Sequence, residues 1–240
     1  MNKRSVRKGL KHLDYNPGQG FTTKEKDIPS LVKDPSLIEL RRMQIIEAAV
    51  DLFVRKGFHE TTTREIARKS GLSIGTIYEY IGSKEDVLYL VCDYIHSCVE
   101  RGIKASITEA KTGKEMLINA IQNYFKVCDD MQDYILLIYQ ETKSLPTDAL
   151  RHVLAKEERI TAYFEEVLRI GQTDKSLVIN AGSITLMAHN IVVLGHMWTF
   201  RRWFFCKHYS LEQYIQIQTS LILSELTKRD VQAQKENNYG

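Results

Sequence analysis

From Asp34 onward, apolar side chains recur at the three- and four-residue spacing of an α-helix, and this periodicity constrains the fold more than any other feature. The first such run consists of Leu40, Met43, Ile46, Val50 and Phe53. Alternation of apolar and polar residues with a period of two, the pattern of a half-buried strand, is essentially absent. The sequence therefore predicts an all-α protein, and its 240 residues are enough for a substantial core.

Residues that cap or break helices predict where the helices begin and end. Asp34 and Pro35 are typical of an N-cap followed by a first helical residue, and Gly57 stops that helix. Thr62 and Glu65 have the spacing of a capping box, which predicts a short helix that ends near residue 71. Breaks further along the chain predict helices at about 83–110, 113–131, 133–143, 147–170, 175–204 and 210–228.

The first 33 residues contain glycine and proline but little apolar periodicity, so residues 1–33 are predicted to form a flexible, loosely attached extension. No acid accompanies its first basic residues, which are Lys3, Arg4, Arg7, Lys8 and Lys11. Two interpretations fit this charge: a solvated tail, and an arm that contacts DNA phosphates or the minor groove. Residues 230–240 are predicted to form a polar, frayed tail.

The composition predicts a cytoplasmic protein without a cofactor. Apolar residues make up 43% of the chain, but no run of about 18 of them is uninterrupted, so no membrane span is expected. No apolar run follows the N-terminal basic residues, so they are not expected to be a secretory signal. The four cysteines form no Cys-x-x-Cys pair, which predicts free and mostly buried thiols.

The most informative segment, Thr61–Leu88, predicts a helix-turn-helix. Two short helices are joined by a turn in which Gly71 supplies a left-handed conformation and Ser73 caps the second helix. The residues expected to bury the crossing of the helices are Ile66, Ala67, Leu72, Ile74 and Ile77. The outer side of the second helix is then expected to carry Gly75, Thr76, Tyr78 and Tyr80.

A second helix of this length fits the major groove of double-stranded DNA and presents its first residues to base edges. Gly75 has no side chain, so the backbone can approach the DNA closely. Tyr and Thr hydroxyls, together with the ammonium of Lys84 at the start of the next helix, are suitable partners for phosphates. Basic charge also gathers at this end of the chain, because residues 1–35 contain eight basic and four acidic residues.

The segment Thr61–Leu88 resembles the DNA-binding signature of the TetR family of bacterial repressors. The preceding helix also matches the family, through Ala48-Ala49, Leu52-Phe53 and Lys56-Gly57-Phe58. One departure is Ile81-Gly82, where the family usually has Phe and a small or polar residue. Because Ile fills the same apolar position, the resemblance holds for the fold.

The resemblance implies about nine helices, with a helix-turn-helix domain at residues 34–84 and a ligand-binding and dimerisation domain at residues 85–229. The last two helices would form a four-helix interface with a second copy. The homodimer would bind a palindromic operator and release it when a small-molecule effector binds, most simply as a repressor. The residues implied to contact DNA are Thr63, Ser73, Gly75, Thr76, Tyr78, Tyr80 and Lys84.

These residues also have purely structural interpretations. Thr63 and Ser73 can serve only as helix caps. Tyr78 and Tyr80 can be surface residues without a partner, and Lys84 can simply be solvated. A helical protein that binds another partner and has lost DNA binding is a further alternative, against which the presence of the whole set argues.

Residues 191–211 are rich in aromatic and basic side chains. Gly195, Trp198, Arg202 and Trp203 resemble a stretch of TetR regulators that control fatty-acid and other acyl-CoA catabolism, although the Pro that often follows there is absent. This resemblance implies an acyl-CoA effector. The alternative is a regulator of efflux or stress genes that responds to a drug-like or aromatic ligand.

The residues themselves allow two roles for this stretch. Trp198 lies four residues before Arg202 and seven before Phe205, so each pair shares a helix face. The stretch forms either an aromatic dimer seam or a site where arginines meet CoA phosphates. The candidate ligand-binding residues are Tyr139, His189, Asn190, Trp198, Arg201 and Arg202.

His189 lies one heptad before His196 in an otherwise apolar helix. The pair fits a metal site, a hydrogen bond in a pocket, or a buried histidine with an ordinary partner. No cysteine or carboxylate completes a metal-binding set, so no metal is expected. Motifs of hydrolases, phosphate-binding loops and metalloproteases are also missing, so the chain is not expected to be an enzyme.

Overall fold

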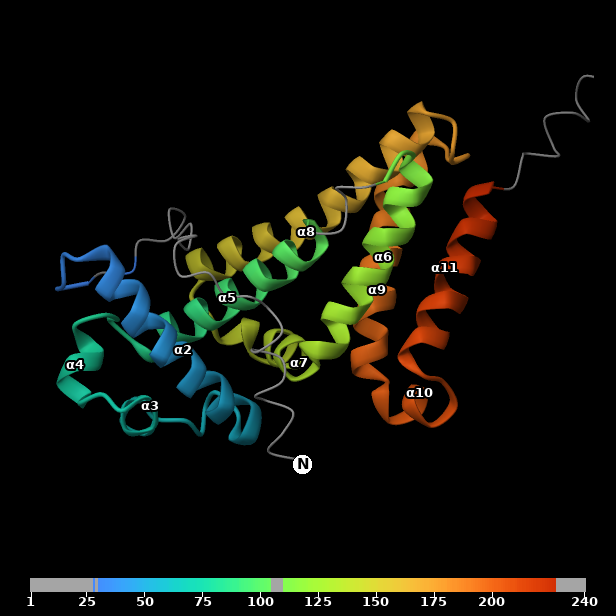
Figure 1. Cartoon of the computed structure of the whole chain (residues 1–240). Helices are drawn as coiled ribbons and strands as arrows, with labels where there is room; N and C mark the ends of the chain where they lie inside the picture. The colour runs from blue at the N-terminus through green and yellow to red at the C-terminus, as the bar shows by residue number, and fades with distance from the viewer. Residues whose placement is uncertain (1–27, 29, 105–109, 228–240) are drawn as a thin grey trace, which may run out of the picture. The chain divides into compact units, whose positions relative to one another are not determined.

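The computed structural model describes residues 28, 30–104 and 110–227, and over these residues it contains helices and no strand (Figure 1). The expected all-α fold is confirmed. The α-helices are α2 (Pro35–Lys56), α3 (Thr63–Ser70), α4 (Ile74–Tyr78), α5 (Lys84–Lys104), α6 (Gly113–Asp130), α7 (Gln132–Glu141), α8 (Thr147–Thr173), α9 (Ile184–Phe200), α10 (Arg202–His208) and α11 (Leu211–Thr227). Two 3-10 helices cover Thr142–Ser144 and Ala181–Ser183.

Side-chain caps set the helix ends at the N-terminal side of the chain, as expected. The Asp34 carboxylate accepts a hydrogen bond from the Ser36 backbone N–H at 2.9 Å, and Pro35 is the first residue of α2. Thr62 and Glu65 form the complete capping box of α3. Ser83 precedes α5 and its hydroxyl accepts from the Asp86 N–H at 3.1 Å. These local bonds satisfy backbone N–H groups that have no partner within the helix.

The expected helix 175–204 is wrong in two places, because it begins later than expected and is interrupted near its end. The chain leaves α8 after Thr173, because the Asp174 carboxylate accepts backbone N–H groups of Ser176 at 2.9 Å and Gly113 at 2.7 Å. A short aspartate that bonds to the backbone in this way competes with helix formation. The helix that follows begins only at Ile184, and it is interrupted at Arg201, which separates α9 from α10.

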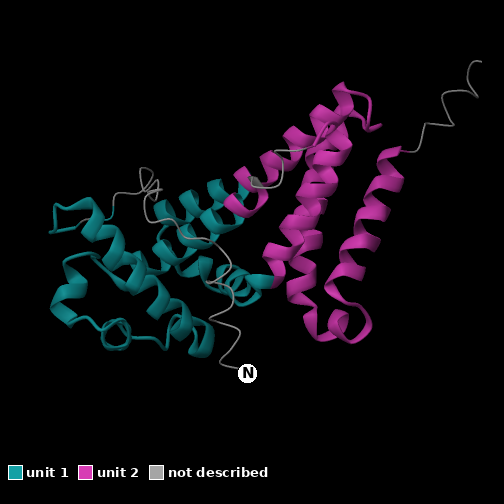
Figure 2. Cartoon of the chain, in the orientation of Figure 1, with its two compact units in different colours: residues 1–100, 130–158 teal, residues 101–129, 159–240 magenta. Residues whose placement is uncertain are grey.

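Two compact units make up the chain (Figure 2). The first contains residues 1–100 and 130–158, and the second contains residues 101–129 and 159–240. Residue 84, where the sequence predicts the end of the helix-turn-helix domain, lies inside the first unit. Within the first unit, α5 is joined to α8 by a buried ion pair between Asp93 and Lys156 and by a 2.9 Å contact between His96 Nε2 and Glu157 Oε2.

Each unit has its own core. In the first unit, the fully buried large residues include Ile45, Phe53, Ile66, Ile77 and Leu88. In the second unit, they include Tyr124, Phe125, Phe164 and Trp198. Three of the four cysteines are buried and all four are free thiols, as expected. Over the described ranges, no helix is long and apolar enough to cross a membrane.

Candidate functional site

The α3–α4 pair forms the helix-turn-helix that the sequence predicts. Gly71 has a left-handed conformation with φ 74° and ψ 18°, and the following Leu72 N–H donates to the Ala67 carbonyl at 3.0 Å. Ser73 then caps α4 by accepting the Thr76 N–H at 3.0 Å. Ile66 and Ile77 are fully buried, so the crossing of the two helices is held by apolar packing.

Most of the residues predicted to contact DNA lie at the surface. Ser73, Gly75 and Tyr78 are exposed, and Thr63 and Thr76 are half-buried. Around a Cβ placed on Gly75, the nearest non-neighbouring atom is Ser73 Oγ at 3.7 Å, an ordinary van der Waals distance, so this glycine is not packed against the rest of the unit. A double-stranded DNA backbone or base edge can therefore approach the first turn of α4.

Tyr80 does not lie on the outer side of α4, contrary to expectation. Its side chain is 3% exposed. The physical reason is that α4 ends at Tyr78 and the chain tightens into a turn, in which the N–H groups of Tyr80 and Ile81 both donate to the Ile77 carbonyl. This turn directs Tyr80 into the first unit instead of along the helix surface. Tyr80 is therefore a core residue of the first unit.

Lys84 is half-buried and held by carbonyl groups. Its ammonium donates to the backbone carbonyls of Phe58 at 3.0 Å, His59 at 3.3 Å and Thr61 at 3.1 Å. It also lies 4.2 Å from the centroid of the Phe58 ring. A lysine has three N–H donors, so in this state all of them have protein partners. Lys84 thus ties the start of α5 to the loop between α2 and α3.

Arg42 is a positioning residue that the sequence analysis missed. It is buried, and its guanidinium donates to the carbonyls of Tyr80 at 3.1 Å and Ile28 at 2.7 Å. A signal existed, because Arg42 shares the apolar face of α2 with Ile45, Ile46 and Ala49. The arginine joins α2, the end of α4 and the chain that precedes α2.

The last residues of the expected loose extension are attached to this unit. Ile28 is 3% exposed, and the Leu31 N–H donates to the Glu79 carbonyl at 2.8 Å. The Ser30 hydroxyl donates to the same carbonyl at 2.9 Å. The basic residues between positions 3 and 11, and the tail 230–240, lie outside the described residues.

In the second unit, Trp198 and Arg202 share one carboxylate. The Trp198 indole N–H donates to Asp129 Oδ1 at 2.8 Å, and Arg202 forms an ion pair with the same oxygen. Trp198 is 2% exposed and stacks on Phe205 with an angle of 18° between the rings. The predicted proximity of these side chains is found, although the interruption at Arg201 places Trp198 on α9 and both Arg202 and Phe205 on α10. The alternative of a dimer seam is wrong for Trp198, which is buried and fixes α9 and α10 to the end of α6.

The glycine of the same stretch also has a packing role. A Cβ on Gly195 would lie 2.5 Å from Tyr124 Cε1, so only glycine allows this approach of α9 and α6. The Tyr124 hydroxyl is 2.8 Å from His196 Nε2, which makes His196 a buried histidine with an ordinary partner. Among the described residues, no group of metal-ligating side chains is found.

The other candidate ligand residues are exposed and do not all lie together in the sequence. His189, Asn190 and Arg201 are exposed on α9 and at its end. The Arg201 guanidinium lies 5.4 Å from the centroid of the Trp203 ring. Tyr139 is an exposed residue of α7, in the first unit.

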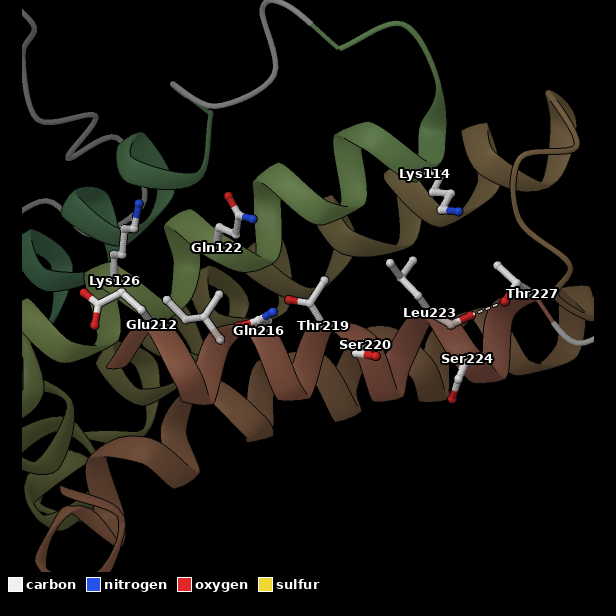
Figure 3. Close-up of a pocket in the computed structure, with 11 residues that line it drawn as sticks. Lys114, Gln122, Lys126, Glu212, Gln216, Thr219, Ser220, Leu223, Ser224 and Thr227 are labelled. Carbon is white, nitrogen blue, oxygen red and sulfur yellow. Dashed lines mark hydrogen bonds between the residues drawn. The ribbon is translucent and has the colours of Figure 1, made fainter. Parts of the chain in front are cut away.

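A groove of about 650 Å³ lies instead between α6 and α11, in the second unit (Figure 3). It is lined by Lys114, Gln122, Lys126, Glu212, Ile215, Gln216, Thr219, Ser220, Leu223, Ser224 and Thr227. None of the candidate ligand residues belongs to this lining. Helical spacing places Lys114, Gln122 and Lys126 on one face of α6, but which helix would lie opposite was not evident from spacing alone.

A capped recognition helix on an all-helical chain defines a helix-turn-helix transcriptional regulator with a separate helical C-terminal part. A family model of tetR-family bacterial regulatory proteins matches residues 45–89, and a model of tetracyclin repressor-like C-terminal domains matches residues 110–207. The HTH-type transcriptional regulator HbdR of Aromatoleum sp. (strain CIB) is 34% identical over 199 residues, which cover 80% of this chain and 82% of HbdR. The chain belongs to the tetR family, whose members are transcriptional regulators and not enzymes.

Solved structures share the fold. A tetR-family regulatory protein from Rhodococcus RHA1 aligns with a TM-score of 0.69 at 24% identity, over 79% of this chain and 98% of that protein. AibR, in complex with isovaleryl coenzyme A and operator DNA, aligns with a TM-score of 0.64 at 17% identity, over 76% of this chain and 98% of AibR.

Proposed function

We propose that this chain is a repressor that binds a palindromic operator as a homodimer and releases it when a small organic effector binds within residues 85–229. The observation that carries the proposal is the first turn of α4. Ser73 caps it by accepting a hydrogen bond from the Thr76 N–H. Gly75 and Tyr78 are exposed, while Ile77 of the same helix is buried. Such a helix can enter the major groove with its N-terminal residues toward the bases.

The structure supports different roles within the predicted DNA-binding set. We assign direct contacts to Thr63, Ser73, Gly75, Thr76 and Tyr78, which are exposed or half-buried. Lys84 adds positive charge beside them while it holds the α2–α3 loop. Tyr80 acts through α4, because its side chain is buried. The basic residues near the N-terminus are proposed to add phosphate contacts.

Exposed apolar stripes support the homodimer. Leu186, Val193 and Phe200 are exposed and lie seven residues apart on α9. Ile217 and Leu221 are exposed and lie four apart on α11. Residues at these spacings share a helix face, and contiguous exposed apolar surface marks an interaction site. A two-fold pair would place two recognition helices in successive major grooves about 34–36 Å apart.

We propose an acyl-CoA as the effector. AibR supports this class, because a regulator with the same fold binds isovaleryl coenzyme A. The second candidate is a drug-like or aromatic ligand of an efflux or stress regulator. In either case a regulator of this kind would act in the cytoplasm, where the bacterial chromosome lies.

Selection from a random duplex library tests the DNA part of the proposal. The wild-type chain should enrich a palindrome, and Tyr78→Ala should bind it more weakly. Tyr139→Ala is a matched control, because Tyr139 and Tyr78 are about equally exposed at 54% and 49%. No enriched sequence, or equal binding by Tyr78→Ala, contradicts the proposal.

Titrating the complex with octanoyl-CoA, CoA and an aromatic drug-like compound tests the effector class. Release by octanoyl-CoA at micromolar concentration, and not by CoA, is expected. Release only by the aromatic compound favours the second candidate.

A further inference from the structure

The α6–α11 groove combines an apolar floor with a lysine at each end. Ile215 and Leu223 provide aliphatic surface, and its volume of about 650 Å³ lies within the range of small-molecule sites. Figure 3 shows Lys126 and Glu212 at one end of the groove and Lys114 at the other, with Thr219 between them. The groove therefore has the chemistry to bind a molecule that is apolar along its length and charged at one end.

Thr219 is the second observation that points to a ligand. The residue is 8% exposed and lines the groove. Its hydroxyl is buried and has no hydrogen-bond partner among the described residues. A buried hydroxyl without a partner costs stability, so it is uncommon without a functional reason. A ligand in the groove would supply the missing partner.

The two lysines differ in how far their charge is available. Lys126 lies close enough to Glu212 to act on it. Hydrogen bonds from the Glu212 backbone N–H and from Ser210 lower the pKa of Glu212 against burial and the charge of Asp129, and the charge of Lys126 makes a smaller contribution in the same direction. Lys114 has no ion pair within the described ranges. Its backbone N–H bonds to Ser176 Oγ at 2.9 Å, which fixes the start of α6 and leaves the ammonium for another partner.

We infer that the α6–α11 groove is an effector site for an elongated organic anion, with the negative group at Lys114, the apolar body over Ile215 and Leu223, and a hydrogen bond to Thr219. The regulatory role of this site rests on the proposed function, whereas binding itself does not. A neutral apolar molecule would leave Lys114 without a counterion. A compact inorganic anion would leave the apolar floor uncovered, so an amphipathic anion fits both features.

Calorimetric titration of the full chain with octanoyl-CoA, octanoate and octanol tests this inference. One of the two anions should bind at least about tenfold more tightly than octanol, because a charge-assisted hydrogen bond contributes more than a neutral one. The two anions distinguish a carboxylate from a CoA phosphate as the group at Lys114. Lys114→Glu should weaken binding of that anion by about tenfold or more. Lys111→Glu is the matched control, since Lys111 is exposed, close in sequence and outside the groove lining.

Thr219→Val gives an independent signature. It replaces the unpartnered hydroxyl with a methyl group of similar size, so the melting temperature of the ligand-free protein should rise. The affinity for the anion should fall several-fold, because the hydrogen bond to the ligand is lost. Unchanged affinity in both groove variants, equal binding of octanol, or no binding of any probe overturns the inference. A change of oligomeric state in Lys114→Glu also overturns it, because the groove would then be an interface between copies. Operator binding by the ligand-free chain, weakened by Tyr78→Ala, reports separately on the proposed function.

Discussion

The ammonium of Lys84 lies 4.2 Å from the centroid of the Phe58 ring and donates a hydrogen bond to the Phe58 carbonyl at 3.0 Å. Lys84, which is proposed to add positive charge beside the DNA, thus also holds the loop between α2 and α3. If Lys84 also contacts phosphate, as proposed, a single side chain links the stability of the helix-turn-helix to its affinity for DNA. Substitutions at this position should change both quantities.

Lys84→Ala is expected to lower the free energy of unfolding by about 1–2 kcal/mol and to weaken operator binding. The loss comes from three hydrogen bonds to carbonyls, reduced by the partial exposure of the side chain. Chemical denaturation and a salt titration of DNA binding measure the two effects. If Lys84 also meets a phosphate, the salt slope should fall by about one unit per subunit. Lys143→Ala, at an exposed position, should change neither quantity.

Truncation of Tyr78 should mainly weaken operator binding, whereas truncation of Tyr80 should mainly lower stability. Tyr78→Ala should leave the melting temperature nearly unchanged and weaken operator binding, because Tyr78 is 49% exposed. Tyr80→Ala should cost about 3 kcal/mol of stability, because it empties a buried aromatic position. Thermal melts and operator titrations of both variants measure this contrast. Equal melting temperatures would show that Tyr80 is not a core residue.

The capping box of α3 should make the stability of the fold depend on pH in the acid range. Hydrogen bonding to the Lys56 ammonium, followed by hydrogen bonds from Thr62, lowers the pKa of Glu65 from 4.5 to about 2. A carboxyl group with a lowered pKa stabilises the fold above its ordinary pKa, and this stabilisation is lost as the pH falls toward the lowered value. Thermal melts should therefore show a loss between about pH 4.5 and 2 that is smaller in Glu65→Gln. If the melting temperatures of the wild-type chain and of Glu65→Gln fall equally over this pH range, the assignment is contradicted.

Local patterns were enough to predict the helix boundaries around the recognition unit. Asp34, Thr62 and Ser73 bond to backbone groups two or three residues away, so their capping roles follow from sequence spacing alone. The break near residue 171 was predicted, but the late start of α9 at Ile184 was missed, in part because the chain after α8 is held by a bond from Gly113, 61 residues from Asp174. Contacts between residues close in sequence could be predicted, whereas contacts between residues far apart in sequence could not.

The same limit applies to the candidate site. The burial of Tyr80 accompanies a bond from Arg42, 38 residues away, and Lys84 bonds to a carbonyl 26 residues away. The α6–α11 groove depends on which two helices lie opposite one another. The Gly195 and Trp198 stretch was recognised, but the carboxylate and tyrosine that explain its residues, Asp129 and Tyr124, come from α6.

Val193→Asp should convert the proposed dimer into monomers and reduce operator affinity. Val193 is 55% exposed at the centre of the stripe formed with Leu186 and Phe200 on α9. In a two-fold dimer the same patch occurs on both subunits, so the substitution would bury one unpaired carboxylate per subunit, which costs several kcal/mol. A monomer has one recognition helix and loses the second half-site. Leu154→Asp is the matched control, because Leu154 is 50% exposed but lies on α8 in the first unit. Sedimentation velocity and operator titration should show a monomer with weak binding for Val193→Asp and a dimer with normal binding for Leu154→Asp. If Val193→Asp stays dimeric and binds the palindrome as tightly as the wild-type chain, the subunits meet through a different surface.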